Sequence, residues 1–295
     1  MPKGFDCGPT DKVARAVFTA IVALCVGAAD ARGQSDTERQ STSPHYLFIA
    51  TDDEDAGRMG PWPLNRSVYA SAIDRAQEDG AKAVVLKFFF DRPSMPEADA
   101  KLAGAIASMP VYLQFAFEKD GELEGPPVWR NDFGAENLKV FFHGSASLLP
   151  LPMFREHAAG IGFVNILPDP THDRIEILGS TGVGLGIAAS LQLLSIEADR
   201  DSQVSVHEMR FGINGKSYEI GDDGRVRCPY LNARPKEYSL FAFLDGQVPR
   251  GEIADHVVVI GNTRDDTPRY TISQNASLPV HELFFRQILC LDGLR

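Results

Sequence analysis

The strongest constraint on the fold is a regular alternation of strand and helix patterns from residue 46 onward. Short apolar runs, typical of buried strands, are separated by stretches in which apolar residues recur at helical spacing. Such an alternation predicts parallel strands joined by helices in right-handed crossovers. The expected elements are a strand at 46–50, a helix at 66–79, a strand at 83–90, a helix at 97–108 and a strand at 111–117.

The second half of the sequence adds both parallel and antiparallel elements. Asn214-Gly215 and Asp223-Gly224 are hairpin turn signals between strand-like runs, and they predict a small antiparallel β-meander. Further strands are expected at 138–143, 164–167, 174–178 and 256–261, further helices at 183–196 and 280–292, and a loop at 51–63. We therefore expect an α/β fold: a single three-layer domain with a mostly parallel sheet flanked by helices, plus the meander.

The first residues have the pattern of a secretory signal peptide. Basic residues precede an uncharged run from Ala16 to Gly27, and Ala29-Asp30-Ala31 supplies small residues for cleavage after Ala31. The alternative is a retained anchor, but such a run rises only about 18 Å as a helix against a hydrocarbon core of about 30 Å. We expect a signal peptide at 1–31, a disordered lead-in at 32–44 and a domain at 45–295. The mature chain is then periplasmic or secreted and does not span the membrane.

Charge and cysteine content limit the partners. The net charge of −11 argues against a nucleic-acid or anionic-lipid surface, because both favour a basic patch. Cleavage after Ala31 would leave Cys228 and Cys290, which can pair in an oxidising compartment. Two separate buried thiols are the alternative.

Acidic side chains follow several of the expected parallel strands. Ligands of open parallel sheets bind beyond the carboxyl ends of the strands, where loops converge. Four loop carboxylates could therefore meet in one crevice: Asp52, Asp53, Asp91 and Asp265. They could hold a hard divalent cation, or a cationic or hydroxyl-bearing ligand. The alternative is that they are solvated, with some of them capping the following helices.

Trp62 lies between Pro61 and Pro63, which restrict the backbone beside a large aromatic side chain. It could form the wall of a pocket or plug the edge of the sheet against Arg66. Common catalytic patterns are missing from the sequence. The glycines from Gly182 do not match the dinucleotide fingerprint, His281-Glu282 lacks the second histidine of a zinc peptidase helix, and no Gly-x-Ser-x-Gly occurs. We expect no catalytic residues and no cofactor, and the sequence specifies no metal.

Several short motifs occur in order along the chain: Ile49-Ala-Thr-Asp-Asp53, Gly60-Pro-Trp-Pro-Leu-Asn-Arg66, Gly80-Ala-Lys82, Phe90-Asp-Arg-Pro93, Gly162 to Asp169, and Val258 to Gly261 followed by Asp266-Thr-Pro268. Together they resemble the CHASE2 domain, an extracytoplasmic sensor module of bacterial receptors. The chain departs from the family pattern at Lys87, where an aspartate is usual, and at Gly261-Asn-Thr-Arg264, where Gly-Ala-Thr-Ala is usual.

The resemblance implies sensing rather than catalysis. Family members usually continue into transmembrane helices and a cytoplasmic output, and neither follows here, so we expect signal transduction through a separate partner such as a membrane-bound kinase or cyclase. The ligand would be a small molecule or peptide, bound by Asp52, Asp53, Trp62, Arg66, Asp91, Asn165 and Asp265. Arg66 would orient an acidic group or support Trp62. The alternatives are an interaction module without a small ligand and a divalent-metal-dependent hydrolase that uses Asp52, Asp53 and Asp91.

Overall fold

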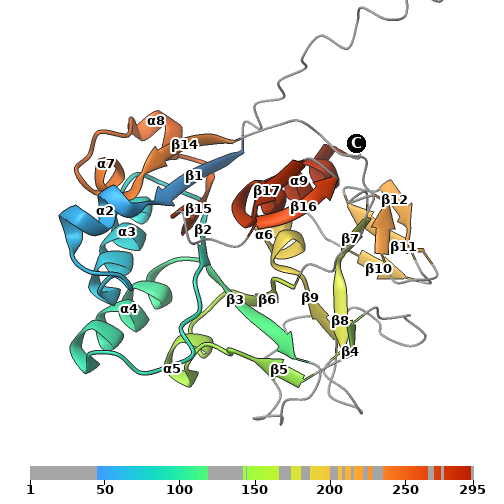
Figure 1. The fold of residues 1–295 in the computed structure, drawn as a ribbon, viewed down its shortest axis with the longest axis horizontal. Coiled ribbons are helices and arrows are strands. Elements are labelled where there is room, and N and C mark those ends of the chain that lie inside the picture. The colour runs from blue at the N-terminus through green and yellow to red at the C-terminus, as the bar shows by residue number, and fades with distance from the viewer. Residues whose placement is uncertain are drawn as a thin grey trace, which may run out of the picture. The chain divides into compact units, whose positions relative to one another are not determined.

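A mostly parallel sheet between two layers of helices organises the structure, a computed structural model (Figure 1). This confirms the expected α/β class. The structure describes residues 45–118, 142–143, 145–165, 174–180, 187–199, 205–207, 210–213, 216–221, 225–227, 235–264, 269–273 and 276–293. The expected signal peptide and lead-in lie outside these ranges. Among the described helices, none is long and apolar enough to cross a membrane.

The main sheet has the strand order β14-β1-β15-β2-β3, and β6 and β5 both pair with β3. All of these pairings are parallel except that of β3 with β5. The strands are β1 (Tyr46–Thr51), β2 (Ala83–Lys87), β3 (Val111–Glu118), β5 (Ser145–Ser147), β6 (Gly160–Phe163), β14 (Lys236–Ser239) and β15 (Val257–Asn262). A strand from the last fifth of the chain, β15, thus lies between β1 and β2.

The helices are α2 (Asp53–Met59), α3 (Arg66–Glu78), α4 (Pro96–Ser108), α5 (Pro152–Arg155), α6 (Leu191–Asp199), α7 (Leu240–Leu244), α8 (Arg250–Ile253) and α9 (Val280–Gly293). Buried side chains of α3, α4 and α7 pack on one face of the sheet, and those of α6 and α9 pack on the other. The two helical layers lie on opposite sides of β1, β15 and β2 in Figure 1.

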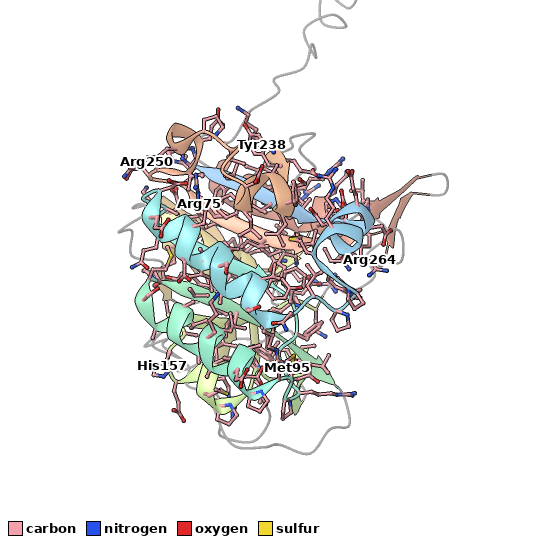
Figure 2. All side chains as sticks on the ribbon, turned by 90° about the vertical axis from the view of Figure 1, so that its left-hand side faces the viewer. Arg75, Met95, His157, Tyr238, Arg250 and Arg264 are labelled. Carbon is pink, nitrogen blue, oxygen red and sulfur yellow. The ribbon has the colours of Figure 1, made fainter. Side chains whose placement is uncertain are left out.

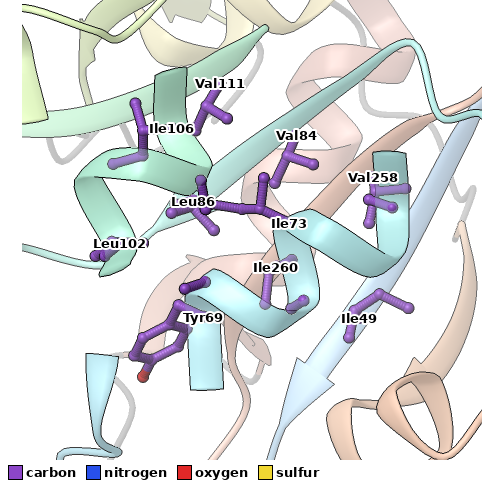
Figure 3. Close-up of a cluster of buried hydrophobic side chains, with 14 of the residues drawn as sticks. Ile49, Tyr69, Ile73, Val84, Leu86, Leu102, Ile106, Val111, Val258 and Ile260 are labelled. Carbon is purple, nitrogen blue, oxygen red and sulfur yellow. The ribbon is translucent and has the colours of Figure 1, made fainter. Parts of the chain in front are cut away.

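Alternation along the central strands supplies both cores. Side chains of a strand point to opposite faces in turn, so a strand buried on both sides is apolar throughout. In β15, Val258 and Ile260 face α3, while Val257 and Val259 face α6 and α9. Figure 3 shows the α3 side, where Ile73 of α3 and Ile106 of α4 meet Leu86 and Ile260 of the sheet.

Smaller sheets complete the described part. A small antiparallel sheet is confirmed, with the strands β10 (Ser205–His207), β11 (Arg210–Ile213) and β12 (Lys216–Glu219). The run at 204–213, expected as one strand, supplies two of them. The strand β13 (Arg225–Arg227) pairs instead with β7 (Arg174–Glu176). The remaining strands are β4 (Phe142–His143), β8 (Leu178–Ser180) and β9 (Ile187–Ala189), which form one sheet, and β16 (Arg269–Ser273) and β17 (Ala276–Pro279), which form another.

Several expected boundaries are wrong. The expected loop at 51–63 contains α2, because Asp52 and Asp55 cap a short helix. The strand β2 ends at Lys87, and Phe88 to Phe90 continue without strand pairing. The helix expected at 183–196 begins only at Leu191, since Ile187–Ala189 pairs with β8. No strand begins at Val164 as expected: β6 covers Gly160–Phe163, and residues 166–167 lie outside the described ranges.

Candidate ligand cavity

A cavity of about 960 Å³ lies at the carboxyl ends of the parallel strands β2, β3, β6 and β15. Its lining comes from the segments 59–66 and 87–95, together with Tyr69, Gln114, Ala116, Val164, Asn165, Asn262 and Val280. Both the position and the volume are typical of small-molecule sites in α/β proteins. The sheet therefore places a cavity where the sequence predicted a crevice.

One wall of the cavity is aromatic. The Trp62 ring lies 6.0 Å from that of Phe88, and Tyr69 packs 4.7 Å from Phe88 and 5.6 Å from Phe90, centroid to centroid. Trp62 therefore forms part of the cavity wall, which is the first of the two roles predicted for it. Two apolar side chains on the rim are exposed to solvent, Phe89 at 40% and Met95 at 56%.

Asp52 does not line the cavity. Its Oδ1 accepts a hydrogen bond from the Asp55 backbone N–H at 2.8 Å, and Asp55 Oδ2 accepts one from the Asp52 N–H at 3.2 Å. This capping box begins α2. Asp52 therefore caps the following helix, which was the alternative to a role in ligand binding. Asp55 also accepts hydrogen bonds from the backbone of Leu240 and Phe241, and so links α2 to α7. Burial raises the pKa of Asp55, and the backbone hydrogen bonds oppose this shift.

Asp53 reaches the cavity only through other side chains. Its Oδ1 lies 3.0 Å from Arg264 Nε, and the Arg264 guanidinium lies over the Trp62 ring, 5.0 Å from its centroid. Arg264 lies beside α2 in Figure 2. Asp53 therefore anchors the cation that covers Trp62 and is not a wall residue itself.

Arg66 lines the cavity, but its charge is neutralised within the fold. Its Nη1 donates to Asp99 Oδ1 at 2.6 Å, both side chains are at most 10% exposed, and Nη2 donates to the Arg92 carbonyl. Its guanidinium also lies over the rings of Phe90 and Phe154. Arg66 therefore holds the 87–95 segment, whereas the sequence suggested an acidic ligand group or Trp62 as its partner.

Asn165 also lines the cavity, and its amide serves the sheet. The Oδ1 atom accepts from the Phe117 N–H at 2.6 Å and Nδ2 donates to the Phe117 carbonyl at 2.9 Å. The Asn165 side chain thus extends the β3–β6 pairing by two hydrogen bonds to the backbone of Phe117. Fewer of its hydrogen-bonding positions remain for a ligand.

Among the described carboxylates that were predicted to gather, only Asp91 lines the cavity. Its Oδ2 lies 3.5 Å from Nε of the exposed Arg92. Asp265 lies outside the described residues. The expectation that Asp52 and Asp53 line an acidic crevice is therefore wrong. Asp52 caps α2, and Asp53 forms an ion pair with Arg264. Among the described residues, no three His, Cys, Asp or Glu side chains gather as metal ligands would, so the hydrolase alternative has no supporting geometry there.

Lys87, the last residue of β2, lines the cavity although it was not predicted as a site residue. Its ammonium lies 3.9 Å from the ring centroid of Phe284 on α9 and has no carboxylate partner among the described residues. Burial lowers the pKa of Lys87 to about 7, from its usual 10.5. A lysine inside the apolar run Ala83 to Phe90 was the available signal.

Two amide side chains share the cavity with Lys87. Gln114 is only 5% exposed, and its amide forms no hydrogen bond with the described residues. It follows Leu113, the partner of Leu86 across the β2–β3 pairing, and so stands beside Lys87. Asn262 Oδ1 accepts from the Arg264 N–H at 3.0 Å, while its Nδ2 has no protein acceptor among the described residues. Gly261, opposite Lys87 on β15, provides room, since an added Cβ would lie 3.4 Å from Lys87 Cβ and 3.2 Å from Phe48.

The predicted disulfide is tested at one end only. Cys290 of α9 is disulfide-bonded, and it is 3% exposed. A free thiol at this position, the alternative raised above, is therefore wrong. Cys228 lies outside the described residues, so its role as the partner stays a prediction.

Comparison with known proteins assigns a family. The model of the CHASE2 domain matches residues 19–285, which is most of the sequence. No curated protein and no solved structure matches the chain.

Proposed function

The chain belongs to the CHASE2 domain family of extracellular sensory domains, and from this premise we propose that it binds a small molecule in the cavity and signals through a separate membrane-bound kinase or cyclase. The observation that carries the ligand-binding part is the cavity itself, with its aromatic wall and its polar groups that lack partners among the described residues. A sensor needs a site whose occupancy changes a surface, and this cavity joins the sheet to α3, α9 and the loops between them.

The experiment is a thermal-shift screen of the purified protein with a broad metabolite panel, using two matched tryptophan variants. Val164→Trp places a large side chain in the cavity, whereas Met153→Trp replaces an exposed side chain of α5 outside it. We expect at least one compound to raise the Tm of the wild type and of Met153→Trp, because a ligand that binds only the folded state stabilises it. The same compound should not raise the Tm of Val164→Trp. No hit in the wild type, or an equal shift in Val164→Trp, would contradict ligand binding in this cavity.

A second candidate, a protein-interaction module without a small ligand, is favoured by the exposed rim side chains Phe89 and Met95. Exposed apolar groups beside a hollow suit a partner segment. In a pull-down from bacterial membranes, this candidate predicts near-stoichiometric recovery of one membrane protein, lost in Phe89→Ala/Met95→Ala and kept in Met153→Ala. Equal recovery by both variants would contradict it.

Export through a signal peptide is also part of the proposal. N-terminal sequencing of protein recovered from the periplasm should begin at Arg32, since cleavage is expected after Ala31. Recovery of a chain that begins at Met1 would contradict this step.

A further inference from the structure

The charges around the cavity differ in whether they have partners. Arg66 pairs with Asp99, Arg92 with Asp91, Arg264 with Asp53, and Arg286 on α9 with Glu282. Within the described part of the chain, Lys87 has only the face of the Phe284 ring. A desolvated ammonium without an anion is costly, and a cation–π contact compensates only in part. The described walls of the cavity therefore hold an unmatched positive charge.

Hydrogen-bonding groups surround that charge. Gln114 is 5% exposed and lines the cavity, so its side-chain amide can hydrogen-bond to a group bound there. Asn262 uses its oxygen on Arg264 N–H and retains its Nδ2 donors. Lys87 and Asn262 thus offer donors, and the Gln114 amide can offer one too.

The remaining wall accepts an apolar body. Trp62, Phe88 and Tyr69 present ring surface, and the methionines and prolines of the 59–66 and 87–95 segments add further apolar surface. A ligand of one carboxylate and a flat apolar body would match both parts of the cavity.

We propose that the cavity binds a small amphipathic monocarboxylate, whose carboxylate contacts Lys87, Gln114 and Asn262 and whose apolar body packs on Trp62 and Phe88. This inference rests on the proposed ligand-binding function and names the chemical class of the ligand. The carboxylate would neutralise Lys87 and satisfy the amides in one step, and the aromatic wall would exclude water from the ion pair and strengthen it.

The test is isothermal titration of three probes that share one ring system: 2-naphthoate, 2-naphthamide and 2-naphthylmethylammonium. The wild type should bind the carboxylate at least about tenfold more tightly than the neutral amide, a difference typical of a charge-assisted hydrogen bond. Lys87→Met keeps an unbranched side chain, one atom shorter and without the charge, and should abolish this preference. Lys101→Met, on the exposed face of α4, is the matched control and should keep it.

The preference should also depend on pH. Lys87 is charged below its pKa of about 7, so between pH 6.0 and pH 8.5 the affinity for 2-naphthoate should fall by about thirtyfold. The other titratable and charged groups that line the cavity or lie on α9 beside it are Arg66, Tyr69, Asp91, Arg92, His281, Glu282 and Arg286. Only His281 ordinarily titrates in this window, and because Lys87→Met retains it, a pH dependence that persists in that variant belongs to His281.

Specific outcomes would overturn the inference. They are equal affinity for carboxylate and amide, tightest binding of the ammonium probe, no binding of 2-naphthoate, or a carboxylate preference that survives in Lys87→Met. In each case the cavity can still be a sensor site, because the metabolite screen tests binding of any class. A neutral or cationic ligand found in that screen would reject the carboxylate class and leave the proposed function standing.

Discussion

At the scale of single residues, the burial of Lys87 gives the stability of the fold a definite pH dependence. The pKa of Lys87 is about 7 in the folded state and about 10.5 when unfolded, so the unfolded state binds more protons between these values. The free energy of unfolding should therefore rise with pH above 7, by up to about 1.4 kcal/mol per pH unit, and the full destabilisation should persist below pH 7.

Lys87→Met should remove this slope and increase stability at pH 6 and 7, because the desolvated charge is gone. Urea unfolding of both proteins between pH 6 and pH 9 measures the effect and avoids the range where tyrosine ionises. Lys101→Met should keep the slope of the wild type. A slope between pH 7 and pH 9 that is the same with and without Lys87 would contradict the buried charge.

The ion pair of Arg66 and Asp99 is buried, and it fixes one side of the cavity. Asp99 Oδ2 also accepts a hydrogen bond from the Ser94 N–H at 2.9 Å. Arg66→Met leaves the carboxylate buried without its cation and should lower the free energy of unfolding by about 3–5 kcal/mol.

The double variant Arg66→Met/Asp99→Asn should recover part of this loss, because the uncompensated charge is removed as well. Arg250→Met changes an exposed arginine of α8 and should stay within about 0.5 kcal/mol of the wild type. Urea unfolding at pH 7 measures all three, and a loss in Arg66→Met no larger than that in Arg250→Met would contradict the structural role of the pair.

At the scale of secondary-structure elements, the contact of β6 with α6 depends on the absence of a side chain. A Cβ added to Gly162 would lie 2.6 Å from the backbone N and Cα of Leu191, the first residue of α6. Backbone atoms cannot move aside as the end of a side chain can, so the helix would have to shift.

Gly162→Ala should therefore destabilise the protein by about 1–3 kcal/mol or more. Gly104, in the middle of α4, is exposed, and a Cβ added there would meet nothing within 4 Å. Gly104→Ala should stabilise by about 0.5–1 kcal/mol, because alanine loses less backbone entropy in a helix. Thermal unfolding of both variants tests the close contact of Gly162 with α6. A change in stability of the same sign in Gly162→Ala and Gly104→Ala would contradict it.

At the scale of the whole described domain, the C-terminal part of the chain completes the sheet that the N-terminal part begins. The strand β15 pairs with both β1 and β2, and Val257 to Ile260 are fully buried between the helical layers. The helix α9 then covers Phe48, and Phe284 of α9 contacts Lys87. The cavity therefore exists only when both parts of the chain are in place.

The disulfide of Cys290 is expected to add to this closure. If Cys228 is its partner, the bridge closes a loop of about 60 residues and should contribute about 4 kcal/mol. Mass spectrometry of a non-reduced digest should find one peptide pair that joins Cys228 and Cys290. Cys228→Ser and Cys290→Ser should then lose stability equally, and a peptide pair with Cys7 or Cys25 would contradict the assignment.

Sequence periodicity alone determined the elements whose burial pattern is continuous. The strands β1 and β3, the helices α3 and α4 and the parallel class were predicted because each pattern is local and spans several residues. The CHASE2 resemblance followed from short motifs in order, and the family comparison confirms it. Trp62, Arg66, Asp91 and Asn165 line the cavity, because they follow strand ends or open a helix there, and their role in ligand binding stays a prediction.

Only the tertiary structure decided what those side chains do. Whether Asp52 caps a helix or binds a ligand depends on which donors lie nearest, and the partners of Asp53 and Arg66 come from distant segments. The strand β14 was not expected from the sequence, and the position of β15 between β1 and β2 was not expected either. Both depend on pairing between strands that are far apart in the sequence. Lys87 shows the reason most directly: its lack of a counter-ion among the described residues is a property of all the elements packed around it, and no local pattern contains that information.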